Sequence, residues 1–482
     1  MSKSIKINVV MNLILSASSM IFPLITVPYV SRVLSVEANG AVSFAQSVTG
    51  FAAIFCTLGI QTYGIRACAQ VRDDREALSR VVRELLLIIA ICTTITMVIF
   101  AILVFTVPRF AEDKLLMAVF SVGIVLTAFG AEWFYQATEQ YVYITVRSLC
   151  FKVIAIIGLF VLVRQEQDYV FYGAFIVFAA SASNIFNMFR LIKSIDWSVK
   201  LSIHPLHHMK PIMVFFGNNL ATSLYLTLDT ILLGFFTVGS YQLGLYQLVM
   251  RLKNVILAGM GSISNAVLPR LSYEVRKHTD VFFSLLKKTS SFSILFSGTI
   301  AIYLFFMAQD IVLLLAGSNF IESVPSMQIM SFVIIVVAIS GVTGFQILTP
   351  LGKEKYMTIS TIIGAIIDIV LNVLLDPSMG AFGASLALLA AETTITAVQL
   401  VFCRKYIRES LDVRNVLVIV LSLFITACVL GMSKQWILHF NPFVNLLIGA
   451  CFLGIAEMVM LMVLKENLVS QTLSGVLKAI GK

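Results

Sequence analysis

Long apolar runs fill almost the whole chain, and a bundle of membrane-spanning helices is the fold that can accommodate them. Apolar residues make up 59% of the 482 residues and charged residues only 12%, whereas a soluble domain has roughly 45–50% and 25%. About fourteen runs reach the length of about 20 residues with which a helix crosses a bilayer. They are too long for barrel strands and do not alternate. We therefore predict an all-α integral membrane protein, with spans at 8–34, 40–63, 84–107, 114–136, 143–163, 169–190, 211–235, 241–266, 289–309, 325–349, 356–375, 381–402, 413–432 and 442–464.

Lysine and arginine are distributed unevenly between the two sides of these spans. With the N-terminus inside, the cytoplasmic segments hold about 26 of these residues and the outer connections about 5. This asymmetry predicts an even number of spans with both termini in the cytoplasm, and it accounts for the net charge of +9 without nucleic acid. The first run lacks a small-residue cleavage site, so we expect a retained helix rather than a signal peptide.

Cysteine and histidine give no sign of a metal framework. The seven cysteines are scattered, without a Cys-x-x-Cys spacing, and packing residues are the expectation. His204, His207 and His208 lie in a basic stretch between two spans. We expect them on a solvated surface, and we predict no metal site and no cofactor other than a coupling ion.

The chain repeats itself after about 204 residues. Gly40 and Gly244 begin matching helices, and Arg66 and Arg270 end them at the same spacing. Six helices per repeat would insert both units in the same direction, related by a pseudo-two-fold axis along the membrane normal, and transporters bind substrate between such halves. The predicted parts are an N-lobe of six spans, a cytoplasmic interfacial linker, a C-lobe of six spans and an appendage of two spans: 1–190, 191–210, 211–406 and 407–482.

Charged side chains inside the bilayer are costly, so each is a candidate for function. A buried carboxyl can take up a proton near neutral pH, which makes Asp229 and Asp368 candidates for ion coupling. Salt bridges, polar packing and arginines that reach the interface from span ends are the structural alternatives. The candidates within or at the ends of the spans are Arg32, Arg66, Glu132, Lys152, Asp229, Arg251, Lys253, Arg270, Asp368, Glu392 and Glu457.

Several segments resemble signatures of Wzx-type oligosaccharide flippases, the polysaccharide biosynthesis proteins of the superfamily that also holds MATE exporters and the lipid II flippase. The first is Pro-Tyr-Val-Ser-Arg-Val-Leu-Ser at 28–35, followed by Gly40. The second is Trp-Phe-Tyr-Gln-Ala at 133–137, where the family usually has glycine in the last position. The second half adds Asp229, Pro-Arg at 269–270 and the segment from Gln346 to Gly352.

The resemblance implies two six-helix lobes around a cationic cavity in a bacterial cell membrane. It implies alternating access that carries undecaprenyl-diphosphate-linked oligosaccharide repeat units from the inner to the outer leaflet, driven by H⁺, Na⁺ or the membrane potential. Arginine suits a diphosphate because its planar fork binds phosphate oxygens in pairs. The helices that line the cleft in that family make four residues the expected diphosphate ligands: Arg32, Arg66, Arg251 and Arg270. The expected coupling or cavity residues are Asp229, Asp368, Glu132, Gln136, Lys152 and Gln346.

Other functions fit the sequence less well. An enzyme of the same pathway would need a sizeable outer loop, and the chain has no P-loop, HExxH or GxSxG motif. The nearer alternatives are a cation-coupled drug exporter, which would not need a basic cleft, and a lipid II flippase. We expect a monomer in contact with membrane lipid, and the polysaccharide polymerase machinery is a candidate partner.

Overall fold

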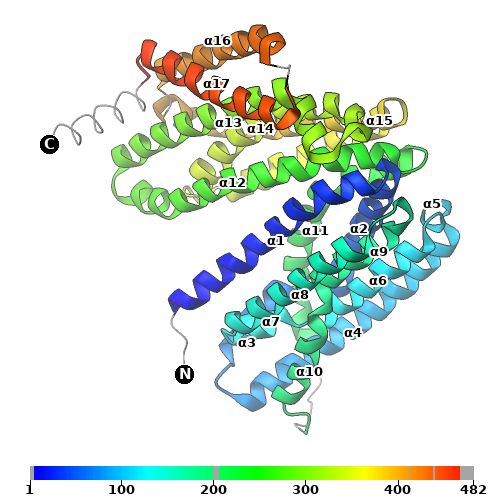
Figure 1. Ribbon diagram of the computed structural model, residues 1–482. Coiled ribbons are helices and arrows are strands. Elements are labelled where there is room, and N and C mark those ends of the chain that lie inside the picture. The colour runs from blue at the N-terminus through cyan, green and yellow to red at the C-terminus, as the bar shows by residue number, and fades with distance from the viewer. Residues whose placement is uncertain (1–4, 199–205, 411, 438–439, 467–482) are drawn as a thin grey trace. The chain divides into compact units, whose positions relative to one another are not determined.

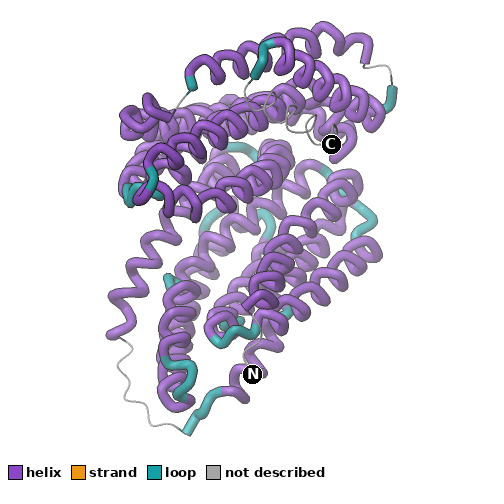
Figure 2. Tube along the Cα trace, turned by 90° about the vertical axis from the view of Figure 1, so that its left-hand side faces the viewer, coloured by secondary structure: helices purple, strands orange, loops and turns teal. Residues whose placement is uncertain are grey.

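The computed structural model describes residues 5–198, 206–410, 412–437 and 440–466 (Figure 1). These residues form helices joined by short connections, without a strand among them (Figure 2). Each of the fourteen predicted apolar runs is helical, which confirms the all-α membrane class. The contacts divide the chain into two compact units, residues 1–244 and 245–482.

The first unit contains the helices of the first seven predicted runs. Prolines 23 and 28 lie inside its first helix, and Ser35 caps the second by accepting a hydrogen bond from the Ala38 amide at 3.2 Å. The elements are α1 (Ile5–Val33), α2 (Val36–Thr57), α3 (Ile60–Gln70), α4 (Arg75–Thr106), α5 (Pro108–Ala111), α6 (Lys114–Phe129), α7 (Glu132–Ala137), α8 (Tyr141–Leu162), η1 (Glu166–Asp168), α9 (Tyr169–Val177), η2 (Phe178–Ala182), α10 (Asn184–Ser194) and α11 (Leu206–Phe236).

Two of the apolar runs are broken by residues in a left-handed conformation. Leu58 (φ 47°) separates α2 from α3, and Ala131 (φ 45°) separates α6 from α7. Such a conformation costs a non-glycine residue roughly 1–2 kcal/mol, so packing must offset it. The short helix α7 inserts Trp133, which is fully buried. A Cβ added to Gly64 on α3 would lie 2.8 Å from the Trp133 ring, so this helix pair requires glycine there.

The aromatic residues of α7 belong to the core of this unit. Their position near a span end is typical of an interfacial belt, yet Phe134 and Tyr135 are 3% and 0% exposed. The Tyr135 hydroxyl donates to the backbone carbonyl of Asn187 at 2.6 Å. The break at Ala131 turns these side chains inward, so a belt assignment for them would be wrong.

Helix α11 packs on α2 and α3. Arg109 holds the end of α11, since its guanidinium donates to the carbonyls of Gly234 at 2.6 Å and Gly239 at 2.8 Å and to the Ser240 hydroxyl at 2.7 Å. The contact-based division therefore falls at residue 244 rather than between spans six and seven. The lobe boundaries drawn from the repeat remain a prediction.

The second unit contains most of α12 (Tyr241–Lys277) and all later helices: α13 (Thr279–Ala316), η3 (Ser318–Ser323), α14 (Val324–Gly341), η4 (Val342–Leu348), α15 (Glu354–Ser410), α16 (Val413–Ile437) and α17 (Pro442–Val463). Gly380 interrupts α15 with φ 54° and ψ −132°, so this element holds two predicted runs. Twelve helices in the described part of the chain are long and apolar enough to cross a membrane, with α15 counted once and the polar α12 not included. The exact number of crossings stays a prediction.

The predicted two-helix appendage packs on α13. Its polar contacts are internal to the second unit. Asn445 on α17 donates to the Asp310 carboxylate at 2.8 Å, the Tyr303 hydroxyl donates to the backbone of α17 at 2.9 Å, and Ser422 donates to Glu457 at 2.6 Å. Glu457 is thus part of the packing between α16 and α17.

Candidate functional site

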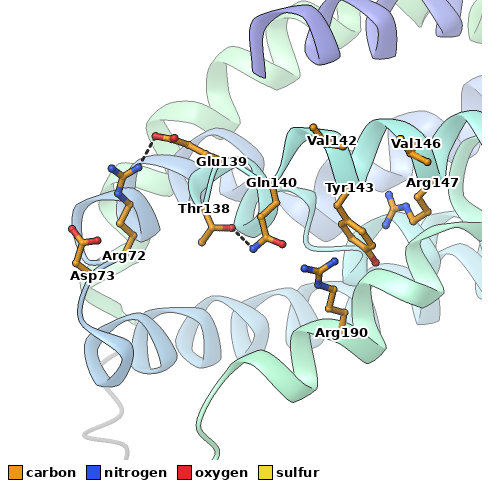
Figure 3. A pocket seen from close by; sticks show the side chains of 10 residues that line it. All are labelled: Arg72, Asp73, Thr138, Glu139, Gln140, Val142, Tyr143, Val146, Arg147 and Arg190. Atoms are coloured by element: carbon orange, nitrogen blue, oxygen red, sulfur yellow. Dashed lines mark hydrogen bonds and ion pairs between the residues drawn. The ribbon is translucent and has the colours of Figure 1, made fainter. Parts of the chain in front are cut away.

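A pocket of about 900 Å³ lies at one end of the first unit (Figure 3). Its walls come from the connection after α3, the connection between α7 and α8, the first turns of α8, and α10. In the predicted topology all of these segments are at the cytoplasmic side. Three arginines and two acids supply its charged lining, and three uncharged polar side chains complete the polar part: Arg72, Arg147, Arg190, Asp73, Glu139, Thr138, Gln140 and Tyr143.

Arg147 is the most buried cation of the pocket, with 7% of its side chain exposed. Its Nη2 atom donates to Glu132 Oε1 at 3.1 Å and to Asn184 Oδ1 at 3.4 Å. Within the described residues, its Nε and Nη1 atoms are buried and have no hydrogen-bond partner. A buried donor left unsatisfied costs about 1–3 kcal/mol, and more when it is charged. An anion that accepts from these two atoms would remove that cost.

Arg190 and Tyr143 form the second part of the lining. The guanidinium carbon of Arg190 lies 4.2 Å from the centroid of the Tyr143 ring, and that of Arg147 lies 5.6 Å from it. The ring face attracts both cations and keeps two like charges close to each other. Figure 3 shows Arg190 of α10 pointing toward Tyr143 and Arg147 of α8.

Arg72 at the mouth of the pocket is already paired. Its Nη1 atom donates to Glu139 at 2.6 Å, and both side chains are close to half exposed. This hydrogen bond raises the pKa of the Arg72 guanidinium further, so the group is always charged. Exposed pairs contribute little to stability. An incoming anion can therefore compete with Glu139 for Arg72.

Three of the predicted cavity residues lie on α7 and α8, the helices whose connection lines this pocket. Glu132 begins α7 and is the ion-pair partner of Arg147. Lys152 donates to the hydroxyls of Ser18 and Ser19 at 2.8 Å each, which ties α8 to α1, and it is within electrostatic reach of Glu132. Gln136 is half-buried one turn after Glu132 on α7.

The other predicted residues of the first unit lie elsewhere. Arg32 is exposed at the end of α1, and Arg66 is exposed on α3, 5.5 Å from the Tyr63 ring and 5.6 Å from the Phe215 ring. Neither belongs to the described lining of the arginine pocket. Asp229 is buried on α11, at 2% exposure.

In the second unit, Arg251 is half-buried and Arg270 exposed, both on α12. Gln346 is buried, and its amide oxygen accepts from the Thr289 hydroxyl at 2.6 Å. Asp368 is buried on α15, and its backbone carbonyl accepts from the Asn372 amide at 2.8 Å. The roles predicted for Gln346, Asp368 and the four arginines stay predictions.

Arg147 and Arg190 were not among the expected ligands, because both contribute to the cytoplasmic excess of positive charge. One signal could have identified Arg147. It lies four residues inside the predicted run 143–163, and an arginine within a span is by default a functional candidate. For Arg190, at the last residue of a run, the sequence holds no such signal.

The histidines of the linker are also placed differently from the expectation. His208 is 2% exposed rather than solvated, because α11 starts at Leu206 and packs its first turn into the first unit. His207 is exposed, and His204 lies outside the described residues.

Comparisons with known proteins agree with this architecture. Two curated proteins, each named "Putative O-antigen transporter", are similar over most of their length. The protein of Escherichia coli (strain K12) is 22% identical over 408 residues, which covers 83% of this chain and 97% of that protein. The protein of Shigella dysenteriae is 24% identical over 407 residues, which covers 81% of this chain and 98% of that protein.

Solved structures share the fold. The lipid II flippase MurJ in an inward closed conformation superposes with a TM-score of 0.72 at 14% identity, covering 96% of this chain and all of that one. An inward-facing multidrug resistance MATE transporter of the MOP superfamily gives 0.61 at 12% identity, covering 81% and 94%. These proteins are flippases and transporters, in agreement with the prediction of a transporter rather than an enzyme.

The family model described as "Polysaccharide biosynthesis protein" matches residues 5–274, more than half of the chain, and so reaches from α1 to the end of the α12 region that carries Arg251 and Arg270. The match covers the flippase-like signatures at 28–35 and 133–137 and the whole arginine pocket. This multi-pass membrane protein therefore belongs to the polysaccharide biosynthesis protein family.

Proposed function

We propose that this protein is a flippase that moves undecaprenyl-diphosphate-linked oligosaccharide repeat units from the inner to the outer leaflet. The observation that carries the proposal is Arg147, a buried arginine on a membrane helix that has two unsatisfied donors and lines a large pocket together with Arg72 and Arg190. A diphosphate carries several charged oxygens, which can accept hydrogen bonds from more than one donor of a guanidinium. A neutral acceptor would form weaker hydrogen bonds with these donors, and a cationic substrate would be repelled by the guanidinium.

The pocket serves as the first binding site for the diphosphate on the cytoplasmic side. Arg147 and Arg190 take over part of the hydration of the phosphates, and Tyr143 presents a ring face next to them. A cavity of about 900 Å³ is large enough for the diphosphate and the first sugars. The polyprenyl tail stays in the bilayer, where its transfer into water would cost about 0.8 kcal/mol per methylene.

Transport then follows by alternating access, with the head group passed to the arginines predicted from the sequence. Arg32, Arg66, Arg251 and Arg270 are spread over α1, α3 and α12, so that phosphate contacts can be exchanged in steps. Asp229 and Asp368, buried on α11 and α15, are the proposed carriers of a coupling H⁺ or Na⁺. A proton or sodium gradient, or the membrane potential, drives the return.

The test is the set of lipid-linked intermediates that build up when the protein is removed from its host. We expect an undecaprenyl-diphosphate oligosaccharide to accumulate on the inner leaflet while the surface polysaccharide is lost. Unchanged lipid intermediates together with reduced efflux of cationic dyes would instead indicate a drug exporter. Accumulation of lipid II would indicate a lipid II flippase.

A further inference from the structure

A second polar cluster lies in the first unit, outside the arginine pocket, where α11 begins against α3 and α4. Tyr63, Glu84 and His208 are all buried there. The His208 imidazole bridges the other two, with Nδ1 2.6 Å from the Tyr63 hydroxyl and Nε2 2.8 Å from Glu84 Oε2. The neighbouring His207 is exposed, and its ring centroid lies 3.7 Å from that of His208. One ligand atom each of Glu84, His207 and His208 lie within 4.8 Å of one another.

We propose that Glu84, His207 and His208 form a binding site for a divalent transition-metal ion of the zinc type. Two imidazoles and one carboxylate are a donor set that zinc uses when it keeps a water as its fourth ligand. Metal–ligand bonds of about 2.0–2.2 Å place the ligand atoms of a tetrahedral site roughly 3.3 Å apart. The 2.8 Å distance between His208 Nε2 and Glu84 Oε2 has to lengthen by about half an ångström. Rotation of the exposed His207 side chain brings one of its ring nitrogens to the third ligand position.

Tyr63 already occupies the position of a supporting group. A metal-bound histidine usually donates its other ring N–H to a fixed acceptor, and this bond sets the tautomer and the ring orientation. With the ion on Nε2 of His208, the Nδ1–H group donates to the Tyr63 oxygen, which lies 2.6 Å away. The ring is therefore oriented for metal binding before the ion arrives.

The exposure of one ligand and the separation of the other two in the chain also favour a metal ion at this site. His207 is exposed, so an ion can reach the buried pair from the aqueous side without unfolding of α11. Glu84 and His208 come from segments 124 residues apart, and a shared ion would fasten α11 to α4. This inference concerns groups that the flippase proposal does not use, and it holds or fails independently of it.

The experiment uses the full chain, purified in detergent with an affinity tag that contains no histidine and stripped of metal with a chelator. Binding of Zn²⁺ is measured by competition with a chromogenic chelator, and Co²⁺ serves as a spectroscopic probe of a four-coordinate site. We expect one ion per chain and a visible cobalt band in the wild type. Glu84→Gln and His207→Ala should each weaken zinc binding at least about tenfold, and Tyr63→Phe by about tenfold through loss of the supporting bond.

His278→Ala is the matched control, because His278 is an exposed histidine before α13, and its zinc affinity should equal that of the wild type. His207→Ala changes only an exposed side chain, so it keeps the test valid if the buried variants fail to fold. Zinc should also raise the unfolding temperature of the wild type but not that of His207→Ala. Equal zinc binding by the wild type and Glu84→Gln, or no stoichiometric binding by the wild type, would overturn the proposal and leave a metal-free hydrogen-bond chain.

Discussion

Removal of the Arg147 side chain is the perturbation that tests the pocket most sharply. Its Nε and Nη1 atoms are buried and have no hydrogen-bond partner among the described residues. A hydrogen bond to a charged group contributes about 1.5–3 kcal/mol, so two bonds to a diphosphate amount to about 3–6 kcal/mol. At 1.4 kcal/mol per factor of ten, Arg147→Ala should weaken binding of the diphosphate by roughly 100-fold or more.

The variant Arg147→Lys distinguishes the contribution of the positive charge from that of the guanidinium geometry. Lysine keeps the positive charge but lacks the planar set of donors of a guanidinium, so we expect a loss of affinity that is smaller than that of alanine yet still measurable. Glu132 loses its ion-pair partner in the alanine variant. Because its side chain is 37% exposed, water can solvate the carboxylate, and the double variant with Glu132→Gln should bind no better than Arg147→Ala alone.

The assay is the Kd for undecaprenyl diphosphate on purified protein in nanodiscs, with monodisperse elution as the criterion of folding. Arg164→Ala is the matched control, since Arg164 is an exposed arginine in the connection after α8, on the predicted outer side. A Kd of Arg147→Ala within about threefold of the wild type would refute the reasoning, because the two donors would then make no contact with the ligand.

Three further predictions concern transport and stability. Gly40→Val should abolish the folded protein, because a Cβ at Gly40 would lie 1.8 Å from a facing backbone carbonyl oxygen; Gly50→Ala, with open space around the added Cβ, is the control, and yield of monodisperse protein is the measurement. Arg251→Ala should abolish transport while the protein remains folded, and near-normal transport would remove it from the substrate path. Trp133→Ala should lose about 3–5 kcal/mol of stability, seen as a fall in unfolding temperature that Trp197→Ala, at 49% exposure, does not show.

The helices could be predicted from the sequence because hydropathy alone determines which segments cross a bilayer. Every apolar run became a helix, including the two joined in α15. The breaks at Leu58 and Ala131 could not be predicted in the same way. Both residues are apolar and continue their runs, and their left-handed conformation depends on the packing of partners such as Trp133, which hydropathy does not describe.

The candidate site was predicted less completely. Charge inside a span identifies costly residues, and this reasoning reached Lys152 on α8 and Glu132, the ion-pair partner of Arg147. It missed Arg147 because an arginine near a span end also satisfies the positive-inside rule. The burial of His208 depends on Tyr63 and Glu84, which are 145 and 124 residues away in the chain. A local pattern in the sequence cannot show such a contact.

The central claim is that this protein moves a lipid-linked oligosaccharide diphosphate between leaflets. The most direct measurement reconstitutes the purified chain in liposomes that carry a labelled undecaprenyl-diphosphate oligosaccharide, and follows the label that becomes accessible to an impermeant reagent on the opposite face. We expect transfer that requires the protein and falls with Arg147→Ala but not with Arg164→Ala. Transfer at the rate of empty liposomes, under an imposed H⁺ or Na⁺ gradient and membrane potential, would contradict the claim.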